Sequence, residues 1–136
     1  MPNIKGLSHV AIAVPDLEAA AQALAAKLGI NAGPIKENPQ QGVRLSYVDL
    51  GNARIELIQP ISPDSPIAKF LERNPAGGLH HVCFNTEDLD VALAAVTQAG
   101  VRQAGKAGLN VHGDRIAFLN PKDVLGALVE LEEKHG

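Results

Sequence analysis

Two histidines and two glutamates recur at matched places in this sequence. His9-Val10 returns as His81-Val82, and Asp16-Leu17 returns as Asp88-Leu89, in each case 72 positions later. An internal repeat of this kind indicates a fold built from two similar halves. Because the repeat copies an ionisable residue together with apolar ones, it also suggests a functional site.

The alternation of side chains along strands identifies the two glutamates as partners of the histidines. Residues 7–14 and 79–85 read as strands, which places His9 and His81 opposite the apolar residues that follow them. Later in each half, Glu56 and Glu130 each stand between two aliphatic residues, 47 positions after His9 and 49 after His81. Gln59 shares the face of those aliphatic residues and is a poorer candidate.

Two imidazoles and two carboxylates that converge form a divalent transition-metal site with room for water or substrate oxygens. A single strand histidine is usually structural, and a strand glutamate between aliphatic residues usually faces solvent. The recurrence of both residue types at matched places favours a metal site at His9, Glu56, His81 and Glu130.

The remaining reactive residues have more ordinary explanations. His80 is expected to pack near the core, and Cys83 has no second thiol, so it reads as a small buried residue. His135 lies in a charged terminal tail and should be exposed. His112, in a glycine-rich loop, is a weak candidate for substrate binding.

An α+β fold is expected to position these residues. Each half shows a strand, a helix and two more strands, with space for one further short strand in its loops. Asp16 is available to cap the first helix, and Thr86 is expected to cap a second helix over about 87–99. Pairing the halves would curl a mixed sheet around a cleft and leave the helices outside. We expect one domain over 1–136, with modules at about 5–61 and 77–133 and a linker helix at about 64–74.

Composition narrows the functional class. The chain has 136 residues, a net charge of -3 and 3% aromatic residues, so nothing indicates a nucleic-acid surface. One cysteine and no long apolar segment favour a soluble cytoplasmic protein without membrane contact.

The sequence resembles the vicinal oxygen chelate superfamily, which includes the glyoxalases and ring-cleaving dioxygenases, and within it the methylmalonyl-CoA epimerases. The resemblance covers nearly the whole chain, and the Asp-Ser-Pro-Ile-Ala segment and the glycine–double-histidine run are its most specific parts. It rests on residues 8–16, 41–43, 55–57, 64–71, 74–82, 121–123 and 128–132.

The resemblance implies two tandem βαβββ modules around a metal, with His9, Glu56, His81 and Glu130 as ligands. It implies inversion at the α-carbon of methylmalonyl-CoA through a metal-stabilised enolate, with Glu130, or else Glu56, moving the proton. Co²⁺ or Mn²⁺ suits such a site, while Zn²⁺ and Ni²⁺ stay open. The implied partners are an acyl-CoA thioester and a second copy of the chain.

Two departures from the family pattern matter. Some epimerases carry a candidate acid/base glutamate where this chain has Leu45, and many have histidine where it has Asn120. The second proton-transfer group is therefore unassigned.

The alternative hypotheses are a glyoxalase I-type lactoylglutathione lyase, an iron dioxygenase and a metal-free binding protein of the same fold. Glu56 argues against the dioxygenase, which needs an open position there. Few aromatic residues argue against the binding protein.

Overall fold

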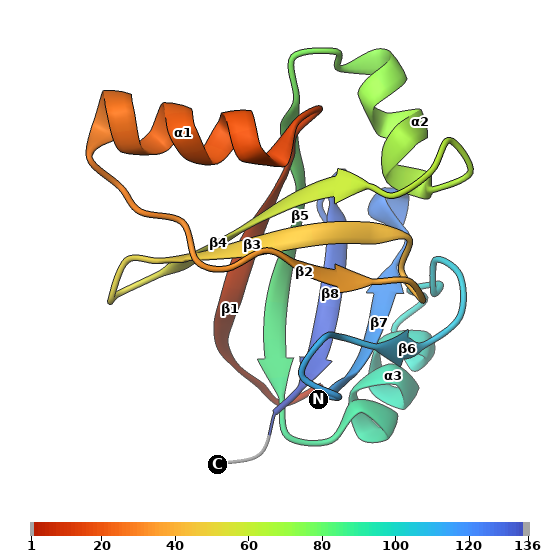
Figure 1. Ribbon diagram of the computed structural model, residues 1–136. Coiled ribbons are helices and arrows are strands. Elements are labelled where there is room, and N and C mark those ends of the chain that lie inside the picture. Colours follow the sequence, from red (N-terminus) through yellow and green to blue (C-terminus); the bar gives the residue numbers. More distant parts are fainter. Residues whose placement is uncertain (1, 135–136) are drawn as a thin grey trace. The chain divides into compact units, whose positions relative to one another are not determined.

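The computed structural model describes residues 2–134, so His135 lies outside the described part of the chain. The elements in chain order are β1 (Ile4–Ala13), α1 (Leu17–Leu28), β2 (Lys36–Asn38), β3 (Val43–Asp49), β4 (Arg54–Pro60), α2 (Pro66–Arg73), β5 (Gly78–Thr86), α3 (Leu89–Gln98), β6 (Gly108–Leu109), β7 (Arg115–Leu119), a 3₁₀ turn (Pro121–Asp123) and β8 (Leu128–Glu133). Figure 1 shows them coloured along the sequence.

This order confirms the prediction of two βαβββ modules in an α+β fold with mixed strand pairing. The extra short strand expected in each half is present, as β2 in the first module and β6 in the second. Helix α2 joins the modules. No helix between residues 2 and 134 is both long enough and apolar enough to cross a membrane.

The chain divides into two compact units at positions inside strands. Unit 1 comprises Met1–His9 and His81–Gly136, and unit 2 comprises Val10–His80. The divisions fall within β1 and β5, because each of these strands contributes residues to both units.

In unit 2, β4 is the central strand. It pairs antiparallel with β3 and parallel with the Val10–Ala13 part of β1, while β2 pairs with the other edge of β3. Helix α1 begins after Asp16, whose carboxylate accepts a hydrogen bond from the Ala19 amide. Leu17 of this helix is buried against Val48 and Leu57.

In unit 1, β1 lies beside β5, and the order continues through β8 and β7 to β6. Val82, Phe84, Val129 and Leu131 pack with Leu89, Ala92 and Val96 of α3, which covers this face of the strands (Figure 1). Full burial of one such leucine or valine side chain stabilises the fold by about 1.5–3 kcal/mol. The opposite face is left to the alternate residues, including His81, Cys83 and Glu130.

The predicted cap of α3 was wrong by two residues. Asp88 caps this helix by accepting a hydrogen bond from the Val91 amide, in the way that Asp16 caps α1. Thr86 is buried, and its hydroxyl donates to the Pro2 carbonyl. The repeat itself pointed to the correct cap, since Asp88 is the counterpart of Asp16.

Among the glycines of unit 2, Gly77 has the least space for a side chain. Its φ is +94°, and a Cβ at this position would lie 2.5 Å from the Ala13 carbonyl oxygen. We predict that Gly77→Ala lowers the free energy of unfolding by about 2 kcal/mol or more, because it adds a backbone clash to an unfavourable φ. Urea unfolding measures the change. Gly51→Ala is the matched control, with a φ of +87° and nothing within 4 Å of its Cβ, and an equal loss in both variants would contradict the clash.

Asp123 ties the loop after α3 to the 3₁₀ turn. Its carboxylate accepts hydrogen bonds from the Arg102 amide and from the Arg102 guanidinium, at 2.9–3.0 Å. These bonds lower the pKa of Asp123 to about 2.

Since the folded pKa lies below the ordinary value of about 4, this stabilisation is present at neutral pH and is lost as pH falls from about 4 towards about 2. We predict that Asp123→Asn is less stable than wild type at neutral pH and that the gap narrows in acid, as measured by urea unfolding. Asp49→Asn removes a longer ion pair with Arg54, in which the carboxylate is more exposed than that of Asp123, and it should cost less at neutral pH. A gap for Asp123→Asn that is constant with pH would contradict the assignment.

Candidate metal centre

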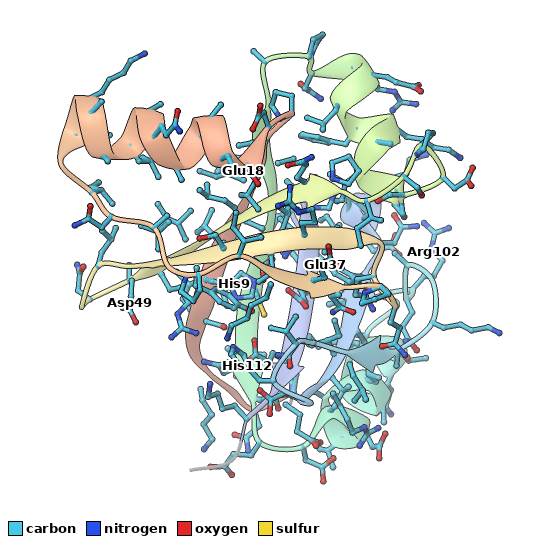
Figure 2. All side chains as sticks on the ribbon, in the orientation of Figure 1. His9, Glu18, Glu37, Asp49, Arg102 and His112 are labelled. Atoms are coloured by element: carbon cyan, nitrogen blue, oxygen red, sulfur yellow. The ribbon has the colours of Figure 1, made fainter. Side chains whose placement is uncertain are left out.

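Three strands of unit 1 bring two histidines and a glutamate together. β1 supplies His9, β5 supplies His81 and β8 supplies Glu130. β5 and β8 run parallel with Cys83 beside Glu130, so the glutamate is held on the face of His81 and away from α3. Figure 2 labels His9 on β1.

Both imidazoles approach the same carboxylate oxygen. His81 Nε2 lies 3.0 Å and His9 Nε2 lies 3.3 Å from Glu130 Oε1. The rings are 5.6 Å apart between centroids with a 73° interplanar angle, so their nitrogens meet at one point without stacking. The three side chains are only 4–6% exposed.

The electrostatics favour an ionised Glu130. Burial raises the pKa of its carboxyl, but the imidazoles of His81 and His9 outweigh that effect and hold the pKa at about 2. The group is therefore a strong ligand for a cation at neutral pH and a weak base.

These residues fit a divalent metal ion. Glu130 Oε1 is buried and has no hydrogen bond of good geometry within residues 2–134. A buried carboxylate oxygen of this kind, facing two imidazole nitrogens, matches the donor set that binds divalent transition metals. His9, Cys83 and Glu130 also offer one donor atom each within 4.8 Å of one another.

Glu56, the fourth predicted ligand, belongs to unit 2. It lies on β4 between Ala11 of β1 and Tyr47 of β3. Its neighbours Ile55 and Leu57 pack with α1 on the other face, as the alternation predicted. Its role as a ligand stays a prediction.

Gln59 faces α1, as expected. Its side-chain oxygen accepts hydrogen bonds from the Leu17 amide at 2.9 Å and from the Arg44 guanidinium at 3.3 Å. It therefore supports the start of the helix.

His80, Cys83 and His112 lie in the surroundings that the sequence predicted for them. His80 packs edge-on against Phe70 of α2, with ring centroids 5.1 Å apart. Cys83 is fully buried, and burial together with the Glu130 and Glu132 carboxylates raises the pKa of its thiol. His112 is exposed on the turn between β6 and β7, where Figure 2 labels it, so a role in substrate binding stays a prediction.

Glu132 and Ser8 were not among the residues predicted for the site. Glu132 is buried on the same face as Glu130, and its Oε2 accepts a hydrogen bond from the Ser8 hydroxyl at 3.0 Å. The same hydroxyl oxygen lies 2.9 Å from His9 Nδ1. The two-residue spacing from Glu130 was a usable signal for Glu132, whereas strict alternation would have turned Ser8 away from His9.

Comparison with known proteins identifies the class. The sequence profile of the glyoxalase/bleomycin resistance protein/dioxygenase superfamily matches residues 8–118. The chain belongs to this superfamily, which confirms the resemblance seen in the sequence.

Within the superfamily, the chain belongs with the methylmalonyl-CoA epimerases. It is 47% identical over 129 residues to the ethylmalonyl-CoA/methylmalonyl-CoA epimerase of Cereibacter sphaeroides, a match that covers 93% of this chain and 96% of that protein. The crystal structure of methylmalonyl-CoA epimerase from Mycobacterium tuberculosis matches with a TM-score of 0.88 and 33% identity, over 98% of this chain and 90% of that one. A variant of the Streptomyces coelicolor enzyme in complex with 2-nitronate-propionyl-CoA matches with a TM-score of 0.86 and 31% identity, over 98% and 100%.

We predict that a divalent metal raises the melting temperature of the wild-type protein and not that of His81→Ala, because an ion that binds the folded state stabilises it. Thermal unfolding with and without Co²⁺, after treatment with a chelator, measures the shift. His112→Ala removes an exposed histidine and should keep the wild-type shift. Equal shifts in all three proteins would place the binding elsewhere.

Proposed function

We propose that this protein epimerises methylmalonyl-CoA, and that it accepts the ethyl homologue as a secondary substrate. The observation that carries the proposal is the pair of buried imidazoles directed at the Glu130 carboxylate in a chain that matches named epimerases over almost all of its length. The acyl-CoA thioester is the expected partner, and a homodimer is expected from the family resemblance alone.

In this proposal His9, His81, Glu130 and Glu56 hold a divalent metal ion. The geometry of unit 1 supports the first three, and the internal repeat supports Glu56. The ion supplies positive charge where negative charge develops on the thioester oxygen. Co²⁺ or Mn²⁺ suits the mixed nitrogen and oxygen donors, and Zn²⁺ or Ni²⁺ would also bind them.

Epimerisation requires that a proton leave the α-carbon on one face and return on the other. We assign this transfer to Glu130 and Glu56, the two carboxylates of the proposed site. Leu45 cannot take part: it is an apolar side chain buried on β3 at the position where some family members carry glutamate. The low pKa of Glu130 makes its carboxylate a weak base, which is the weakness of an assignment of the proton transfer to Glu130 alone.

Deuterium uptake at the α-carbon of methylmalonyl-CoA in D₂O tests the function. We expect uptake that requires a divalent metal and falls at least about 100-fold in Glu56→Gln and in Glu130→Gln, since an amide cannot carry the proton. A parallel metal titration of each variant separates the two roles: a variant that binds metal but does not exchange has lost a proton carrier, and one that loses both has lost a ligand.

Asp49→Asn is the control for a carboxylate outside the proposed site, and it should exchange at a rate close to that of wild type. Absence of uptake with Co²⁺, Mn²⁺, Zn²⁺ and Ni²⁺ would refute the epimerase proposal. Turnover of hemithioacetals of glutathione would then favour the alternative hypothesis of a lactoylglutathione lyase.

A further inference from the structure

A buried series of hydrogen bonds connects Glu132 to His9 through Ser8, and all three residues belong to unit 1. The Ser8 hydroxyl lies 3.0 Å from Glu132 Oε2 and 2.9 Å from His9 Nδ1. Glu132 Oε2 itself is 4.0 Å from His9 Nδ1, so the serine stands between the carboxylate and the ring. The side chains of Glu132 and His9 are only 4–5% exposed.

The number of donors determines which atoms of Glu132, Ser8 and His9 carry the protons. An ionised carboxylate only accepts, and a serine hydroxyl has one proton to give. The Ser8 proton goes to Glu132, so the serine oxygen must accept from His9 Nδ1–H. With Nδ1 donating to the serine, Nε2 is the ring nitrogen left to bind a cation beside Glu130 Oε1; without an ion, Nε2 can carry a proton of its own and donate to that carboxylate.

The groups close to the Glu132 carboxylate can all donate hydrogen bonds to it. The Cys83 thiol lies 3.7 Å from Oε2, and burial together with two carboxylates raises the pKa of that thiol, so it keeps its proton as a donor. The Lys134 ammonium lies 3.9 Å from Oε1. The groups that these distances place around the carboxylate are all proton donors.

We propose that Ser8 and Glu132 are positioning residues, which hold His9 in the Nδ1-protonated form and thereby prepare Nε2 to bind the metal ion. This inference deepens the proposed function and rests on its metal site. Outer partners that fix the tautomer of a ligating histidine typically change metal affinity by about 10–100-fold when they are removed.

The internal repeat does not account for the hydrogen bonds between Glu132, Ser8 and His9, because the other half of the sequence lacks the equivalent residues. Ser8 and Glu132 correspond to His80 and Ile58 in the other half, at the offsets that relate His9 to His81 and Glu56 to Glu130. The repeat copies the candidate ligands and does not copy the pair behind His9.

The first test is the tautomer of His9 in metal-free protein. Long-range ¹H–¹⁵N correlation at about pH 8, above the ordinary imidazole pKa of about 6.5, reports which ring nitrogen carries the proton. We expect Nδ1 to be protonated in wild type and in Ser8→Thr, which keeps the hydroxyl, and Nδ1 to lose its proton in Ser8→Ala. A lone pair on Nδ1 in wild type would overturn the proposal.

The second test is Zn²⁺ affinity measured against a competing chelator. Ser8→Ala and the isosteric Glu132→Gln should bind Zn²⁺ about tenfold or more weakly, whereas Ser8→Thr should stay within about threefold of wild type. Unchanged affinity in Ser8→Ala and Glu132→Gln would overturn the positioning role. Wild-type protein that binds no divalent ion would instead refute the metal site of the proposed function, and the tautomer measurement would still decide the assignment at His9.

Discussion

The buried carboxylate of Glu130 is the interaction on which the candidate site depends. Removing a carboxylate from water costs several kcal/mol unless other groups compensate for the lost hydration. Here the compensation comes from His9 and His81, at 3.3 and 3.0 Å, and it is strong enough to keep the carboxyl ionised. The three residues come from the start, middle and end of the sequence, so the site exists only when β1, β5 and β8 are assembled in the correct register.

The apolar face of the same strands fixes that register. Val129 and Leu131 of β8 pack with Leu89 of α3, and Glu130 lies between them in sequence on the opposite face. A slip of one residue would turn the glutamate into the helix interface and expose the aliphatic side chains, a change that both faces oppose. The hydrophobic core of unit 1 thus selects the position of the charge, although it does not touch it.

Because one face of these strands forms the core and the other forms the site, the periodic features of the structure could be predicted from the sequence. Alternation and the internal repeat were enough to predict the βαβββ modules, the face of His81 and Glu130, and the turning of Gln59 towards α1, because each depends on a period that the residues carry themselves. The cap of α3 was misplaced at Thr86, which local preference favours, although Asp88 repeats Asp16. Ser8 could not be predicted, because its contact with Glu132 joins residues 124 positions apart and depends on side-chain reach and not on strand parity. The placement of Glu56 relative to unit 1 rests on the repeat and the family resemblance.

Duplication supplies ligands in pairs, but the two imidazoles of this protein are not equivalent. Nδ1 of His9 faces a serine backed by a carboxylate, whereas the ring of His81 packs edge-on against Phe118 with centroids 5.3 Å apart. A carboxylate that accepts through a hydroxyl makes the His9 ring a better electron donor. The difference between the two candidate ligands therefore arises from the residues that the repeat did not copy. In a duplicated site, those residues are where one half can be tuned without changing the other.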